Sequence, residues 1–95
     1  MNIQINAVNF SVDIKLEEFI YKIINKLRAI DRQIVSVEVF LNIDKSQYHK
    51  NKIVKIKLNS TDSEYFAKKK TNTFEKSADL VSKALRKQII KNKSK

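Results

Sequence analysis

Residues 73–93, which read TFEKSADLVSKALRKQIIKNK, decide the fold of this chain. Their apolar side chains recur in steps of four, three, four and four, the repeat of one face of an α-helix. These are Phe74, Ala78, Val81, Leu85 and Ile89. A line of lysines follows the same steps displaced by two residues, which is about 200° around a helix. It consists of Lys76, Lys83, Lys87 and Lys91. The stretch therefore predicts a helix with a buried apolar face and a cationic face turned away from the core.

A second amphipathic helix is predicted nearer the N-terminus. Asp13 is a suitable N-cap, because its carboxylate can accept hydrogen bonds from the free amides of a first helical turn. Apolar residues then follow at helical spacing up to Ile30. They are Leu16, Phe19, Ile20, Ile23, Ile24, Leu27 and Ile30. The opposite side of this helix carries Lys15, Glu18, Lys22 and Lys26.

Four stretches alternate apolar and polar residues and predict strands: 2–8, 35–43, 54–59 and 64–71. In the second of these, the residues at alternate positions form one apolar face: Val35, Val37, Val39, Leu41 and Ile43. The last is the weakest prediction, because three lysines follow Tyr65 and Ala67. Asn72 or Thr73 is expected to cap the final helix, and Asn72 with Glu75 has the capping-box spacing.

The predicted order is β-α-β-β-β-α, an α+β fold. Two helices with single apolar stripes and a sheet with one apolar face bury these surfaces together when both helices lie on one side of the sheet. We therefore expect a two-layer sandwich like that of double-stranded-RNA-binding domains. The 95 residues suffice for one domain, spanning residues 1–95, and no linker or repeat is present.

The charge of the chain is unevenly distributed. Residues 1–44 carry five basic and six acidic side chains, whereas residues 45–95 carry fifteen and four, and the net charge is +10. Such asymmetry is typical of contact with nucleic acid or an anionic membrane, although lysine is also a common surface residue in chains of this composition. The first twenty residues include acidic side chains and no continuous apolar run, so we expect a cytoplasmic protein without a membrane span.

Catalytic and metal-binding patterns are missing from the sequence. The single histidine, His49, lies in a polar loop, and the chain contains neither cysteine nor glycine. A lone histidine lacks the companions that metal binding or nucleophilic catalysis requires, and a phosphate-cradling loop needs glycine. We therefore expect no enzyme activity, no metal and no cofactor.

The remaining signal is the cationic surface of the two helices, which suits RNA phosphates. Exposed aromatic residues that could stack on bases are few. Tyr48 is the best candidate, and Phe40 lies on the polar side of its strand. This favours recognition of RNA shape and backbone over a single-strand code. A monomer is expected, although the outer sheet face, with Phe40, Lys55 and Lys57, could host a partner.

Across its whole length the chain resembles the ribosome hibernation promoting factors, also called ribosome-associated inhibitors or ribosomal subunit interface proteins, in their short form. The resemblance runs from the opening strand Asn2-Ile-Gln-Ile5 through Leu16-Glu-Glu-Phe19 and Asn25-Lys26-Leu27 to the strand end Phe66-Ala-Lys-Lys69. It is strongest in the last helix, where Thr73-Phe-Glu-Lys-Ser-Ala-Asp79 and Leu85-Arg-Lys-Gln-Ile-Ile-Lys-Asn-Lys93 are similar to the family pattern. Lys87 stands where Arg is common, and Ala84 stands where many relatives have Lys.

The resemblance implies the same β-α-β-β-β-α fold and a bacterial stress or stationary-phase role. Such proteins bind the small ribosomal subunit and its 16S ribosomal RNA in the channel of messenger and transfer RNA, near the A and P sites. They stop translation by steric occlusion and preserve idle ribosomes. Long-form relatives carry a second, dimerising domain, which this chain is expected to lack. The resemblance implicates Lys26, Lys87, Lys91 and Lys93; the positions on the helix faces add Lys22, Lys76, Lys83 and Arg86.

Other functions remain open at this point. A free-standing double-stranded-RNA-binding domain shares the α-β-β-β-α order, but lacks the first strand. A membrane-surface protein would use the basic amphipathic helix, whose apolar stripe has few bulky anchors. A regulatory interaction with a protein, for example with the transcription machinery, would also suit a basic surface.

Overall fold

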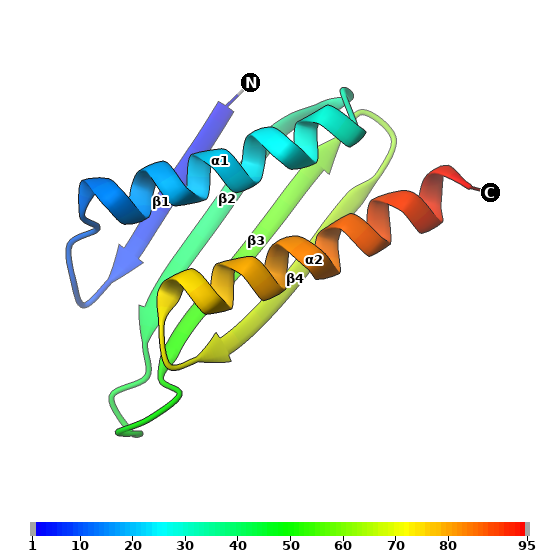
Figure 1. Cartoon of the computed structure of the whole chain (residues 1–95). Coiled ribbons are helices and arrows are strands. Elements are labelled where there is room, and N and C mark those ends of the chain that lie inside the picture. Colours follow the sequence, from blue (N-terminus) through cyan, green and yellow to red (C-terminus); the bar gives the residue numbers. More distant parts are fainter. Residues whose placement is uncertain (1, 95) are drawn as a thin grey trace.

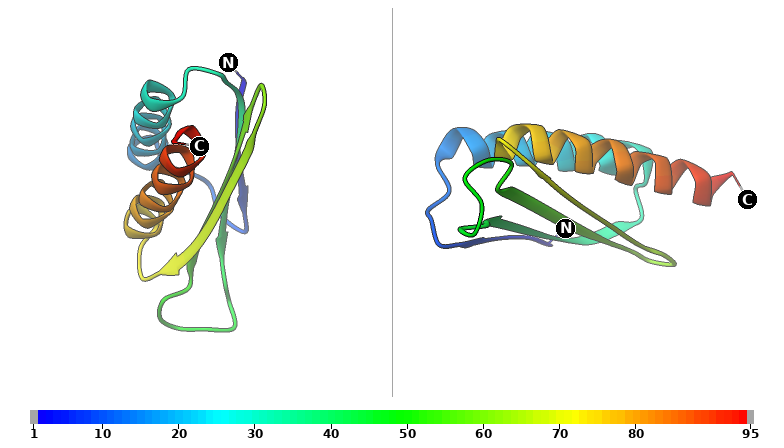
Figure 2. Two further views of the ribbon diagram at one scale, coloured as in Figure 1. Left: turned by 90° about the vertical axis from the view of Figure 1, so that its right-hand side faces the viewer. Right: turned by 90° about the horizontal axis from the view of Figure 1, so that it is seen from below.

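A computed structural model describes residues 2–94 of the chain and confirms the predicted order of elements. The elements are β1 (Asn2–Val8), α1 (Ile14–Ile30), β2 (Ile34–Ile43), β3 (Lys52–Ser60), β4 (Glu64–Thr71) and α2 (Phe74–Lys93). Both helices lie on one face of a four-stranded sheet and run in the same direction across it (Figure 1). Seen edge-on, helices and sheet form two layers (Figure 2). The two-layer α+β prediction is therefore correct.

The strands lie in sequence order across the sheet, β1-β2-β3-β4. β1 and β2 are parallel, so α1 forms the crossover that joins them. The pairs β2–β3 and β3–β4 are antiparallel and are joined by short connections. The helix-facing side of the sheet carries most of its apolar residues, because side chains alternate between the two faces of each strand.

The core lies between the two layers and follows the register of the sheet. Val39 of β2 pairs with Ile56 of β3, which pairs with Ala67 of β4, and all three side chains are buried. The predicted stripe of α2 is buried above these strands, with Leu85 among its fully buried residues. From α1, Leu16, Ile20, Ile23, Ile24 and Leu27 complete the core, with Phe19 and Ile30 partly buried at its margin.

The helix caps test the sequence predictions at single residues. Asp13 caps α1 as predicted, because its carboxylate accepts from the amide of Leu16 at 2.8 Å. Thr73 caps α2, its hydroxyl accepting from the amide of Lys76 at 3.1 Å. Asn72, the other candidate, instead accepts from the backbone N–H of Lys50 at 2.9 Å. The capping box predicted for Asn72 and Glu75 is therefore wrong, since Asn72 lies one residue before the cap.

One side chain assigned to the apolar face of β2 points the other way. Val35 was expected inside, but it is 51% exposed, and Ile34 is buried in its place. The register of β2 against β3 shifts between Ile34 and Ser36, so the alternation of side chains changes phase there. Such a bulge places an extra residue in one strand, and periodicity alone cannot reveal it.

The free edge of β4 is covered by a side chain of α2. The Gln88 amide donates to the carbonyl of Phe66 at 2.8 Å and accepts from the N–H of Phe66 at 3.2 Å. A glutamine side chain thus makes the two hydrogen bonds that a further strand would make at this position. Pairing of this kind blunts an edge that could otherwise recruit another chain. It also fixes the backbone of Phe66 relative to α2.

Candidate nucleic-acid interface

All eight residues predicted to contact RNA are exposed on the two helices. Lys22 and Lys26 lie one turn apart on α1, and Lys87 and Lys91 lie one turn apart on α2. The others, all on α2, are Lys76, Lys83, Arg86 and Lys93. Because the helices lie side by side on the same face of the sheet (Figure 1), these cations occupy one side of the molecule. None is buried in the core, so the fold leaves them available for a ligand.

Two of these eight residues, both lysines, are engaged in ion pairs within the chain. Lys83 contacts the carboxylate of Asp79, one turn earlier on α2, at 3.2 Å. Lys93 lies 3.9 Å from the carboxylate of Asp31, a nearly buried group at the end of α1 that also accepts from the N–H of Gln33. Within residues 2–94, the other six form no ion pair. The unpaired cations therefore include both one-turn pairs.

Ala84, where the sequence departs from the family pattern, is partly buried and packs against the core. Its neighbour Lys83 is exposed, but the contact with Asp79 neutralises part of its charge. Exposed ion pairs of this kind contribute only about 0.2–1 kcal/mol, so a phosphate can displace the carboxylate. Lys83 can thus supply a cation near Ala84, at the expense of an intrahelical pair.

A shallow cavity of about 250 Å³ opens at the N-terminal end of α2, and further lysines line it together with Lys76. Its lining includes Lys50 from the β2–β3 loop and Lys70 from the end of β4, together with Thr71 and Asn72. Lys50 adopts a positive φ of 54°, and the Asn72 side chain holds its backbone N–H. The cationic surface thus continues beyond the helices to the end of the sheet. Helical and strand periodicity do not point to Lys50 or Lys70, because the turn that places them beside Lys76 has no clear sequence signature.

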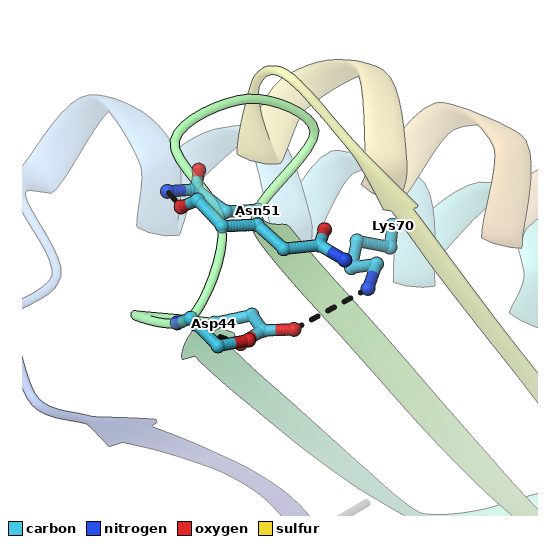
Figure 3. A network of polar contacts seen from close by, with 5 residues as sticks. Asp44, Asn51 and Lys70 are labelled. Atoms are coloured by element: carbon cyan, nitrogen blue, oxygen red, sulfur yellow. Dashed lines mark hydrogen bonds and ion pairs between the residues drawn. The ribbon is translucent and has the colours of Figure 1, made fainter.

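Lys70 is partly neutralised by Asp44, the residue that follows β2 (Figure 3). Its ammonium nitrogen lies 3.3 Å from the Asp44 carboxylate. Hydrogen bonds donated to this carboxylate by the hydroxyl and the N–H of Ser46, with a smaller contribution from Lys70, lower the pKa of Asp44 below its usual 3.8. Asp44 is therefore ionised at neutral pH, which leaves Lys50 and Lys76 as the better anion ligands in this cavity.

A second cavity, of about 170 Å³, differs in charge. Two acidic residues, Asp31 and Asp62, line it with Lys93, Tyr65 and Asn92. Asn92 donates to the hydroxyl of Tyr65 at 2.9 Å, which links the end of α2 to β4. Because carboxylates repel phosphate, this cavity is not a site for a nucleic-acid backbone. Lys93 therefore serves partly to join the ends of the two helices.

Other functional groups are sparse in the described part of the chain. His49 lies exposed in the β2–β3 loop. Residues 2–94 hold no cluster of three or more His, Cys, Asp or Glu side chains that could bind a metal ion. Neither helix is long and apolar enough to cross a membrane. Phe66, which was not among the aromatic residues predicted to be exposed, is 51% exposed on the sheet face opposite the helices.

The sequence matches the model of a known protein family. The family model described as "Sigma 54 modulation protein / S30EA ribosomal protein" matches residues 3–95. No curated protein matches the sequence. Among solved structures, a ribosomal subunit interface protein from Coxiella burnetii is similar, with a TM-score of 0.88, 23% identity and complete coverage of both chains. The N-terminal domain of Thermus thermophilus Protein Y is also similar, with a TM-score of 0.81 and 13% identity over 94% of this chain and 96% of the other. At these identities the two structures support the fold.

Proposed function

Since the chain belongs to the Sigma 54 modulation protein / S30EA ribosomal protein family, the family of ribosome hibernation factors, we propose that it binds the small ribosomal subunit and blocks translation. Its site would be the channel that messenger and transfer RNA share, near the A and P sites. Binding there excludes those ligands sterically, so that an idle ribosome is silenced and preserved. The contacts are to 16S ribosomal RNA.

The observation that carries this proposal is the exposed cationic surface on the paired helices. Lys22 and Lys26 of α1, with Lys87 and Lys91 of α2, point away from the core and have no ion-pair partner within residues 2–94. Such cations have no counter-charge within the described domain, and each can neutralise an RNA phosphate and release a counterion. Phosphate contacts fix position and orientation without reading base sequence. A surface of this kind suits a channel walled by folded RNA.

Occlusion requires a domain that keeps its shape in the channel. The buried contacts between both helices and the sheet, together with the caps on both helices, supply that rigidity. No catalytic group is needed, because the bound domain acts by occupying space. The cations at the cavity beside Lys76 extend the contact surface to the end of the sheet, so that Lys50 joins the expected set.

The proposal is tested with isolated subunits. Purified protein is sedimented with small subunits and, separately, with large subunits, in buffer of constant Mg²⁺. We expect saturable binding to the small subunit only. Equal binding to both subunits, or to an RNA duplex of similar length, would instead favour a general double-stranded-RNA-binding module.

A further inference from the structure

The sheet face opposite the helices is open to solvent (Figure 2) and carries an unusual set of side chains. Because the strands alternate, this outer face takes the residues between the buried positions of β2, β3 and β4. It includes two phenylalanines, four lysines and two glutamates. They are Phe40 and Phe66; Lys55, Lys57, Lys68 and Lys70; and Glu38 and Glu64. An exposed face of a small sheet does not need phenylalanine for its own packing.

The two rings stand apart from each other. Phe40 on β2 pairs with Lys55 on β3, and Phe66 on β4 pairs with Lys57, two residues further along β3. With strands about 4.8 Å apart and a rise of about 3.4 Å per residue, the two Cα atoms are separated by about 12 Å. Phe40 is 38% and Phe66 51% exposed. Each ring is thus a separate apolar platform with a lysine beside it, rather than half of one continuous patch.

The lysines of this face differ in whether an ion pair within the chain already engages their charge. Lys57 lies 3.5 Å from the carboxylate of Glu64, and Lys70 is paired with Asp44. Lys55 and Lys68, which pair with each other across β3 and β4 in the same row as Phe40, form no ion pair within residues 2–94. Lys55 lies directly beside Phe40, and Lys68 lies two residues along β4 from Phe66, so each ring has a free cation near it that can contact a phosphate while a base stacks on the ring.

Phe66 is held in place although it lies on an edge strand. The side chain of Gln88 makes hydrogen bonds to both its N–H and its carbonyl. An edge residue with its backbone fixed in this way loses little further freedom when a ligand stacks on its ring, so more of the stacking energy appears as affinity.

From these observations we propose that the outer sheet face binds single-stranded RNA, with one base stacked on Phe40 and another on Phe66. Lys55 contacts a phosphate near the first base, and Lys68 contacts one near the second. Exposed aromatic residues on a four-stranded sheet are a recurrent platform for unstacked bases, and stacking tolerates any base because every base has a π-face. A protein partner fits less well, since the lysines of β3 separate the rings and no large apolar patch forms. The inference concerns the face away from the helices and does not depend on the ribosomal function proposed above.

The test uses the isolated protein and a fluorescein-labelled octamer of uridine, followed by fluorescence anisotropy. Phe40→Leu and Phe66→Leu keep apolar bulk but remove the aromatic ring, and each is expected to weaken binding about 5- to 150-fold. Phe40→Tyr and Phe66→Tyr are expected to retain the affinity. Tyr21→Leu is the matched control, because it removes an aromatic ring of similar exposure, 37%, from α1 on the opposite face of the molecule, and it should leave the octamer affinity unchanged.

A polyphosphate competitor separates stacking from charge. It has no bases, so its affinity should be the same for the parent and the leucine variants. Leucine variants that bind the octamer as well as the parent would overturn the proposal and leave a purely electrostatic contact. If the leucine variants differed from the parent in sedimentation coefficient but not in affinity for the octamer, the proposal would also be overturned. The face would then be assigned to contact with a second copy of the chain. Because both rings are exposed, each variant is expected to melt within a few degrees of the parent.

Discussion

Raising the monovalent salt concentration from about 50 to about 200 mM, at constant Mg²⁺, is expected to weaken ribosome binding by about 10³- to 10⁵-fold. The reason is counterion release: each lysine that neutralises a phosphate frees a condensed cation, and added salt opposes that release. The estimate assumes about six to ten phosphate contacts, which the exposed cations of α1, α2 and the adjoining cavity can supply. Equilibrium binding to fluorescently labelled small subunits, measured at five or more salt concentrations, gives the slope directly.

A shallow salt dependence would contradict this expectation. If affinity changed by less than about tenfold over the same range, only one or two phosphates would be neutralised. The contact would then be dominated by apolar or neutral polar groups, and the helix surface would not be its main element. Ribosomes that dissociate at the higher salt would mimic the predicted loss, so subunit integrity is checked by sedimentation in each buffer.

Replacing Lys87 and Lys91 by glutamate is expected to lower ribosome affinity at least about 100-fold near 0.1 M salt. One lost phosphate contact weakens binding by roughly tenfold under these conditions, and reversed charges add repulsion. Both side chains are exposed, and neither forms an ion pair within the described residues. The slope of log affinity against log salt should also decrease by about two.

Folding should survive this double substitution. Lys91 lies in the last turn of α2, where a cation interacts favourably with the negative end of the helix dipole, so its loss costs about 0.3–1 kcal/mol of unfolding free energy. For a domain of this size that corresponds to a melting temperature lowered by less than about 8 °C. A larger fall would mean that these side chains contribute to the core.

The matched control replaces Arg32 and Lys45 by glutamate. Both side chains are exposed, Arg32 in the turn between α1 and β2 and Lys45 in the β2–β3 loop, and the change in net charge is the same. Both lie outside the expected contact surface, so the loss of affinity should be clearly smaller than for the α2 variant. Equal losses would show that total charge, and not its position on α2, controls binding.

Most of the fold could be predicted from sequence because its elements have strong periodicity. The apolar stripe of α2 and the apolar faces of β2 and β3 can each be buried in only one orientation. Burying them against one another requires two layers. The predictions that failed concern single residues. Val35 was predicted on the wrong face because a bulge shifts the register of β2. Asn72 was predicted as a helix cap, but its side chain accepts a hydrogen bond from the distant N–H of Lys50, a contact that local sequence does not reveal.

The candidate surface was predicted less completely. Exposure of the seven lysines and Arg86 follows from helical phase, and all eight residues are exposed. Ion pairing does not follow from phase: the contact of Lys93 with Asp31 joins residues far apart in sequence. The grouping of Lys50 with Lys76, and of Phe66 with Phe40 on the outer face, depends on how strands pair and where the chain turns. Such groupings are properties of the register, which composition does not encode.

The most direct test of occlusion is a competition on intact ribosomes. Ribosomes are loaded with messenger RNA and initiator transfer RNA, or left empty, and the purified protein is added before sedimentation through sucrose. We predict saturation at about one copy per empty ribosome and loss of binding to loaded ribosomes. Undiminished binding to loaded ribosomes would contradict the account, because a protein that shares the channel cannot bind beside its ligands.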